Sequence, residues 1–273
     1  MASDAYSALI PFANELADLA RARARRYFRS ELEVSIKADA SPVTQADQEI
    51  EREIRQAIAA RHPDHACYGE EDGGTVGNGL TWVVDPIDGT RSFICGVPLF
   101  GSLIALLDAG VPVLGVLEMP MLGERWVGHA GGTTLNGKPV RVSGCATLGE
   151  ARLFATSPEM FTGTDAEAFA AVSRQVRVRR FGTDCYAYGL LATGCCDLVI
   201  EASLQPYDVM ALVPVIEHAG GIVTNWHGAP IGPGFDGRIV AAASRALHAQ
   251  ALAVLNGIGN GNDNGSGNSN SNS

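Results

Sequence analysis

The sequence predicts a layered protein of α+β and α/β class. Two amphipathic helical patterns open the chain, short β-rich runs with hairpin spacing follow, and strand and helix patterns alternate in the second half. We expect one folded unit over residues 1–256, with an antiparallel-sheet half at about 1–145 and an α/β half at about 146–256. Residues 257–273 are almost entirely Gly, Asn and Ser, and this composition predicts a disordered tail.

The two opening helices are predicted from residue spacing. Apolar residues recur every three or four positions over residues 6–28 and again over residues 44–61. Asp47 lies one turn before Ile50 on the apolar stripe of the second helix, so its side chain is expected to face the body of the protein. The alternative is that Thr44 and Asp47 only cap this helix, because their spacing is that of a capping box.

The remaining elements follow from β-rich runs and helical spacing. Strands are expected at 66–68, 80–84, 99–107, 111–117 and 125–127, with a hairpin turn at Asp108-Ala109-Gly110. In the second half, strands are expected at 152–155, 176–181, 197–201 and 238–242, and helices at 165–172, 185–192 and 209–219.

Composition restricts the classes of function. The chain has 20 Lys and Arg against 30 Asp and Glu, a formal charge of −10, which argues against nucleic acid as a partner. The six cysteines lack the paired C-x-x-C spacing of zinc and redox sites and are expected to be reduced thiols. No apolar run reaches about 18 residues. We therefore expect a cytoplasmic enzyme without a membrane partner.

The segment from Asp85 to Thr90 carries the strongest chemical signal. A hydrophobic strand is expected to end at Asp85, Pro86 to fix a turn, and Gly89-Thr90 to open a helical turn whose free N–H groups could hold a phosphate. Asp85 and Asp88, three positions apart across this turn, can converge on one metal ion. Hard oxygen ligands of this kind suit Mg²⁺.

The alternative is that these acids are only turn or cap residues, since Asp is common in turns. The run Glu70-Glu71-Asp72 favours a metal site, because three adjacent carboxylates repel one another and a cation relieves that repulsion. Asp208 has a similar second interpretation, as an acid favoured by the dipole at the start of a helix.

Taken together, four spaced motifs resemble the signature regions of the inositol monophosphatase family. They are Lys37 with Ser41-Pro42-Val43-Thr44-x-x-Asp47, Gly69-Glu70-Glu71, Asp85-Pro86-Ile87-Asp88-Gly89-Thr90, and Pro206-Tyr207-Asp208 with Glu217-x-Ala219-Gly220-Gly221. The resemblance implies an αβαβα sugar-phosphatase fold, Mg²⁺ as cofactor, a small phosphate monoester as substrate and a homodimer.

The resemblance also implies residue roles. The metal ligands it implies are Glu70, Asp85, the carbonyl of Ile87, Asp88 and Asp208, with Glu70 counted among the catalytic residues as well. Asp47 and Thr90 match the pair that activates the attacking water. Gly89 and Thr90 match the phosphate cradle.

The substrate is indicated by a departure from the general pattern. Tyr207 stands where most inositol monophosphatases have Trp, and the segment from Asp184 to Gly189 is similar to the histidinol-phosphate phosphatases of the family. Histidinol carries an amine and an imidazole, so its pocket should contain acids, for which Asp184 and Glu201 are the candidates. Their alternatives are a helix N-cap for Asp184 and a solvated strand-end acid for Glu201.

The expected function is therefore a Mg²⁺-dependent phosphomonoesterase acting on histidinol phosphate. An inositol-1-phosphatase or a broad-specificity sugar phosphatase is the alternative within enzymes. A regulatory binding protein of the same fold is the alternative from another class, against which the acidic charge and the complete set of acids argue.

Overall fold

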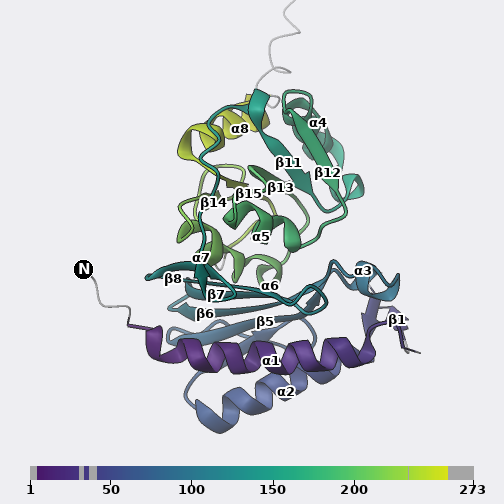
Figure 1. The fold of residues 1–273 in the computed structure, drawn as a ribbon, viewed down its shortest axis with the longest axis vertical. Helices are drawn as coiled ribbons and strands as arrows, with labels where there is room; N and C mark the ends of the chain where they lie inside the picture. The colour runs from purple at the N-terminus through teal and green to yellow at the C-terminus, as the bar shows by residue number, and fades with distance from the viewer. Residues whose placement is uncertain (1–4, 31–33, 37–41, 233, 258–273) are drawn as a thin grey trace, which may run out of the picture.

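The computed structural model describes residues 5–30, 34–36, 42–232 and 234–257. Two helices, a large sheet, a middle layer of helices, a smaller sheet and two further helices follow one another through the molecule (Figure 1). This five-layer order agrees with the predicted fold class. The predicted tail from residue 258 onward and the motif residues Lys37 and Ser41 lie outside the described residues.

The elements of the first half form the first two layers. They are η1 (Ser7–Leu9), α1 (Ile10–Tyr27), β1 (Val34–Ile36), β2 (Pro42–Thr44), α2 (Gln45–Arg61), β3 (Ala66–Gly69), β4 (Gly73–Gly74), β5 (Leu80–Asp88), α3 (Thr90–Ile94), β6 (Gly101–Asp108), β7 (Val111–Met119), β8 (Glu124–His129), β9 (Gly132–Leu135) and β10 (Lys138–Pro139). Their large sheet has the order β10-β9-β8-β7-β6-β5-β3-β4, in which only β3 and β5 run parallel among the described strands.

The second half supplies the other three layers. Its elements are η2 (Leu148–Glu150), β11 (Arg152–Ala155), η3 (Pro158–Met160), α4 (Gly163–Ser173), β12 (Val178–Phe181), α5 (Tyr186–Ala192), β13 (Leu198–Glu201), α6 (Pro206–Val209), α7 (Leu212–Glu217), β14 (Ile222–Thr224), β15 (Ile239–Ala242) and α8 (Arg245–Gly257). Its sheet has the order β12-β11-β13-β15-β14, with a parallel and an antiparallel part.

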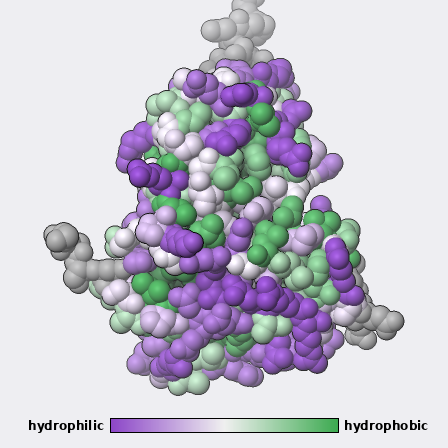
Figure 2. All heavy atoms as spheres, viewed as in Figure 1, coloured by the Kyte–Doolittle hydropathy of each residue, from purple (hydrophilic) through white to green (hydrophobic). Residues whose placement is uncertain are grey.

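Strand alternation divides the core into layers. Trp82 and Val84 of β5 pack under α1 and α2, whereas Val83 between them faces the middle helices α5 and α7. A third cluster, which includes Leu198 and Leu247, fills the space between the small sheet and the outer helices α4 and α8. Hydrophilic side chains dominate the outer face of α1 and α2 in Figure 2, as expected for helices with one buried stripe.

A pair of glycines allows the two halves to meet closely. Gly115 of β7 and Gly128 of β8 are direct partners across the large sheet. A Cβ at Gly115 would overlap the carbonyl oxygen of Ala211, and one at Gly128 would overlap the carbonyl of Pro214. The backbone around α7 therefore lies directly on the backbone of the sheet at this seam.

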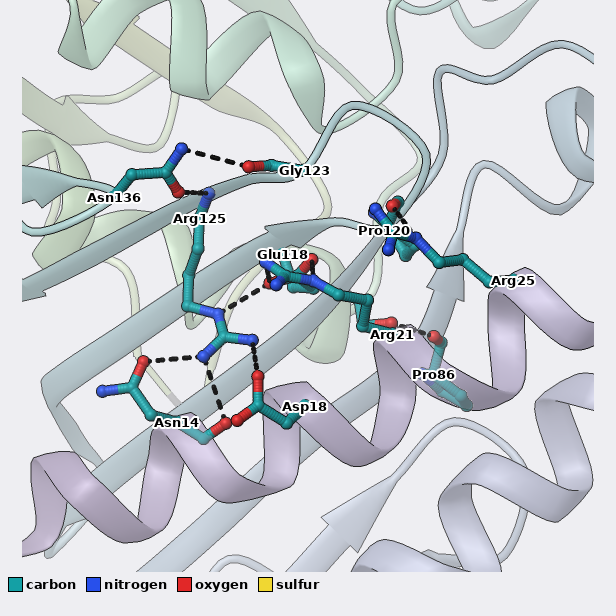
Figure 3. A network of polar contacts seen from close by, with 11 residues as sticks. Asn14, Asp18, Arg21, Arg25, Pro86, Glu118, Pro120, Gly123, Arg125 and Asn136 are labelled. Atoms are coloured by element: carbon teal, nitrogen blue, oxygen red, sulfur yellow. Dashed lines mark hydrogen bonds and ion pairs between the residues drawn. The ribbon is translucent and has the colours of Figure 1, made fainter.

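A buried ion cluster fastens α1 to the same sheet. Glu118 of β7 has no exposed side-chain surface and accepts hydrogen bonds from Arg21 of α1 and Arg125 of β8. Arg125 also donates to Asp18 and to the side chain of Asn14, both on α1 (Figure 3). Both carboxylate oxygens accept from arginines, so Glu118 links α1 and β8 to β7.

Several predicted boundaries were wrong. The first helix starts at Ile10 rather than residue 6, since Pro11 favours the first turn of a helix. The helix predicted at 209–219 is two short helices, because Pro214 has no N–H to donate to the carbonyl of Met210. Gly257, assigned to the tail, is the last residue of α8, a helix that was not predicted. Strands β1, β2, β4, β9, β10 and β14 were also missed.

The strand predicted to end at Asp85 continues to Asp88. Asp85 pairs with Leu103, and Asp88 pairs with Gly101. Between these two pairs β5 has two residues and β6 has one, so β5 contains one extra residue. Pro86 therefore lies in a β-bulge and not in a free turn. Among the described residues, no helix combines the length and the apolar character needed to cross a lipid bilayer.

We predict that Gly115→Ala lowers the melting temperature of the protein, because the added methyl group pushes against the backbone at Ala211. Overpacking of this kind costs about 1–3 kcal/mol, which corresponds to several degrees in a protein of this size. Thermal unfolding followed by circular dichroism measures the change. Gly149→Ala is the control, since a Cβ at Gly149 meets open space, and equal melting temperatures for the two variants would contradict the seam.

Candidate active site

Three carboxylates from both halves of the chain converge at one place. Asp85 and Asp88 come from the end of β5, and Asp208 comes from α6. One ligand oxygen from each lies within 4.8 Å of the others. Asp85 is buried and the other two are partly exposed, so the cluster lies between the interior and solvent. The structure thus brings together three of the five predicted metal-ligating residues.

The parallel pairing of β3 with β5, the one parallel pair among the described strands of the large sheet, places Glu70 beside this cluster. Gly69, the last residue of β3, pairs with Val84, and the N–H of Glu70 donates to the carbonyl of Val84 at 3.2 Å. The residue after Val84 is Asp85, so Glu70, which follows the end of β3, lies beside Asp85 within β5. The charge of Glu70 accordingly helps to raise the pKa of Asp85, after the larger effect of burial.

The cluster has the electrostatic character of a cation site. Burial, followed by the neighbouring carboxylates, raises the pKa values of Asp85 and Asp88 well above the usual range and that of Asp208 to about 7. Within the described residues, Oδ1 of Asp85 is buried and has no hydrogen-bond partner. Crowded carboxylates with an unused oxygen are the donor set that a hard divalent cation fits.

Asp208 and Asp47 each cap a helix and still face the site. Oδ2 of Asp208 accepts from the N–H of Gln205 in a capping box. Oδ2 of Asp47 accepts from the N–H and hydroxyl of Thr44 at 2.9 and 2.6 Å, which is the predicted cap of α2. Oδ1 of Asp47 is buried and unpartnered among the described atoms. Burial, with Glu70 nearby, raises the pKa of Asp47 to about 7.

The predicted phosphate loop directly follows Asp88 of the carboxylate cluster. Gly89 has a φ of 83° and precedes α3, which starts at Thr90 as the sequence predicted. The Thr90 hydroxyl donates to the carbonyl of Ile87 at 3.0 Å, so the backbone oxygen predicted as a metal ligand lies beside the hydroxyl predicted to activate water. No contact between Asp47 and Thr90 is seen among the described hydrogen bonds, and their pairing stays a prediction.

Asp184 is not a helix N-cap. Its φ is 44°, and α5 is preceded instead by Cys185, whose N–H donates to Oδ2 of Asp88 at 2.8 Å. Oδ2 of Asp184 accepts from the hydroxyl of Ser92 at 2.7 Å. A Cβ at Gly89 would lie 3.1 to 3.3 Å from the Asp184 side chain, which places this carboxylate against the phosphate loop.

Glu201 is not a solvated acid, because only 2% of it is exposed. Its Oε1 accepts from the N–H and hydroxyl of Thr156, and its Oε2 accepts from the hydroxyl of Tyr188 at 2.6 Å. Burial raises the pKa of Glu201 to about 7, and Asp184 is close enough to add to that shift. Glu201 therefore lies near the site with both oxygens engaged.

Two supporting residues were missed by sequence reasoning. Glu51 of α2 is fully buried and accepts from the N–H groups of Glu71 and Asp72 at 2.7 and 3.0 Å, and from Arg55 at 2.8 Å. It thereby holds the turn that carries Glu70. Glu51 lies one turn after Asp47 on the same face of α2, and this spacing could have identified it as a buried acid from the sequence. Ser92, the partner of Asp184, gave no such signal.

Known sequences resemble the chain over nearly its full length. Residues 5–259 match the inositol monophosphatase family. The chain is 45% identical to the chloroplastic bifunctional phosphatase IMPL2 of Arabidopsis thaliana, over 89% of this chain and 73% of that protein. It is 39% identical to a histidinol-phosphatase of Chlorobaculum parvum, over 90% of this chain and 96% of that protein.

Solved structures show the same fold. An inositol monophosphatase from Zymomonas mobilis superposes with a TM-score of 0.85 at 40% identity, covering 92% of this chain and 98% of that one. A Thermotoga maritima inositol monophosphatase superposes with a TM-score of 0.82 at 26% identity, covering 91% and 97% of the two chains.

We predict that Asp85→Asn abolishes stabilisation by Mg²⁺. Without divalent cations the variant should melt at or above the temperature of the unchanged protein, since a crowded carboxylate is gone. Added Mg²⁺ should raise the melting temperature of the unchanged protein alone, because only a folded state that binds a ligand is stabilised by it. Differential scanning fluorimetry with EDTA or Mg²⁺ measures both.

Asp197→Asn is the matched control for this experiment. Asp197 is also buried, but Arg152 pairs with it at 2.7 Å. Its replacement should lower the melting temperature with or without Mg²⁺ and leave the response to Mg²⁺ intact. An Asp85→Asn protein that gained as much from Mg²⁺ as the unchanged protein would contradict the metal site.

Proposed function

The chain belongs to the inositol monophosphatase family and is a phosphoric monoester hydrolase, and we propose that it is a Mg²⁺-dependent histidinol-phosphate phosphatase. The observation that supports this choice is Asp184, an acid held by Ser92 against the phosphate loop. Histidinol-phosphatases from three organisms are between 34% and 39% identical to the chain.

Mg²⁺ would be held by Glu70, Asp85, the carbonyl of Ile87, Asp88 and Asp208. Two observations support this assignment: Oδ1 of Asp85 has no hydrogen-bond partner among the described atoms, and three carboxylates approach one another closely. When bound, the cation supplies positive charge that offsets the charge of the phosphate oxygens and favours ionisation of water.

The chain's own residues orient the phosphate and move the proton. The N–H groups at Gly89 and Thr90 bind the phosphate, and the Thr90 hydroxyl passes the proton of the attacking water to Oδ1 of Asp47, which has no other described partner. The water oxygen attacks phosphorus in line, and the bond from phosphorus to the alcohol oxygen breaks. The alcohol oxygen takes a proton from solvent, leaving histidinol and phosphate.

Two acids would favour a cationic leaving group. Asp184 would accept a hydrogen bond from the amine or the imidazolium of histidinol. Glu201, whose oxygens are engaged by Thr156 and Tyr188, would add negative potential to the same pocket.

The homodimer implied by the family resemblance and a cytoplasmic location belong to the same proposal.

Inositol 1-phosphate is the second candidate substrate. The structure with 40% identity to this chain is an inositol monophosphatase, and the bifunctional plant relative shows that one chain in this family can carry two activities. A substrate panel decides between them. Initial rates should be measured with histidinol phosphate, inositol 1-phosphate and fructose 1,6-bisphosphate, each with Mg²⁺ and with EDTA. The highest kcat/KM on inositol 1-phosphate would reject the proposal.

We predict that Asp47→Asn and Thr90→Ala each lower kcat by about 10²-fold or more with little change in KM, because both act on the proton in the transition state. Asn can still accept the hydrogen bonds of the α2 cap, so the fold should persist. The double variant should lose about as much as the single ones. A loss equal to the product of the single losses would show that the two residues act separately.

We predict that Asp184→Ala loses activity on histidinol phosphate while its activity on p-nitrophenyl phosphate is nearly unchanged. Removing one partner of a partly buried charged pair costs about 2–5 kcal/mol, so kcat/KM on histidinol phosphate should fall more than tenfold. p-Nitrophenyl phosphate, whose leaving group carries no positive charge, is the control for the metal site. Parallel loss on both substrates would make Asp184 a structural support of the loop.

A further inference from the structure

The bulge that carries the metal-binding acids faces a single residue of the next strand. Asp85 pairs with Leu103 and Asp88 pairs with Gly101, so Pro86 and Ile87 together lie opposite Ser102. A bulge of this kind disrupts the ladder locally, and its peptide groups need other partners. Proline adds to the disruption because it has no N–H.

Ser102 supplies one of those partners with its side chain. Its hydroxyl donates to the carbonyl oxygen of Pro86 at 2.6 Å, and the residue is only 1% exposed. The next carbonyl, that of Ile87, accepts from the Thr90 hydroxyl at 3.0 Å. Two successive carbonyls of the bulge are thus held by hydroxyl groups from different elements, which fixes the orientation of the Pro86–Ile87 and Ile87–Asp88 peptide planes.

Ser102 lies beside the buried ion cluster of Glu118. Its partner on the other side, across β6 and β7, is Glu118. Arg21 and Arg125 bind both oxygens of Glu118, and Figure 3 shows Pro86 close to this cluster. The bulge therefore pairs with β6, which pairs on its other side with β7, and Glu118 of β7 binds Arg21 of α1.

We propose that Ser102 is a positioning residue for the metal site. By holding the Pro86 carbonyl, it orients the peptide that follows, so that the carbonyl of Ile87 and the carboxylates of Asp85 and Asp88 are directed toward one point. The proposal rests on the metal role given above to these residues. Without the hydroxyl, the buried carbonyl of Pro86 loses this donor, and the bulge can adopt other peptide orientations.

The competing explanation is that the bond only adds stability, as any buried hydrogen bond does. Metal affinity separates the two. Residues that orient metal ligands typically change the affinity for the metal 10- to 100-fold when removed. A purely stabilising bond would lower the melting temperature of the metal-free protein and leave the affinity of the folded protein unchanged.

The experiment measures the dissociation constant for Mg²⁺ by isothermal titration calorimetry on three proteins below their melting temperatures. They are the unchanged full chain, Ser102→Ala and Thr133→Val. Thr133→Val is the matched control, because the Thr133 hydroxyl also makes a buried bond to a carbonyl, that of Val215, at 2.8 Å. Thr133 lies on β9, three strands away from β6.

We expect Ser102→Ala to weaken Mg²⁺ binding roughly tenfold or more, and Thr133→Val to leave it unchanged although both variants lose melting temperature in EDTA. Ser102→Cys, which keeps the side-chain shape with only a weak S–H donor, is the second variant and should also bind more weakly. Unchanged affinity in a folded Ser102 variant, or equal weakening by Thr133→Val, would overturn the positioning role. No Mg²⁺ binding by the unchanged chain would instead reject the proposed metal function itself.

Discussion

The site depends on one electrostatic constraint: carboxylates from two halves of the chain are held within a few ångströms of one another in a partly buried place. Asp85, Asp88 and Asp208 each have a raised pKa because burial and like charge both oppose their ionisation. Such an arrangement persists only if the surrounding structure enforces it. The parallel pairing of β3 with β5, the bulge in β5 and the start of α6 are the elements that do so.

Several acids of the site have two tasks, which explains why their alternative interpretations were hard to separate. Asp47 uses one oxygen to cap α2, and its other oxygen has no hydrogen-bond partner in the described part of the chain. Asp208 caps α6 and still joins the carboxylate cluster. A capping bond fixes the side chain in one rotamer, so the second oxygen is oriented at no further cost in side-chain entropy. For these residues a structural role and a chemical role are compatible.

Residue patterns predicted the layers and the Asp85 to Thr90 segment because hydrophobic periodicity and short motifs are local properties of a chain. They did not reveal the bulge, since the register of β5 against β6 depends on residues that are distant in sequence. For the same reason Ser102 and Ser92 had no visible role. The interruption between α6 and α7 was visible in principle at Pro214, but its apolar neighbours fitted one long helix. The positive φ of Asp184 could not be predicted from residue type alone.

The seam at Gly115 and Gly128 bears on how such chains can diversify. Side chains at an interface can be exchanged for others of similar volume, but here the main chain of one half rests on the main chain of the other. Recombination between relatives that differ at the seam would join halves with mismatched spacing, and Asp208 would then be displaced from the carboxylates of β5. Chimeric proteins should therefore inherit both glycines and the turn around α7 from a single parent.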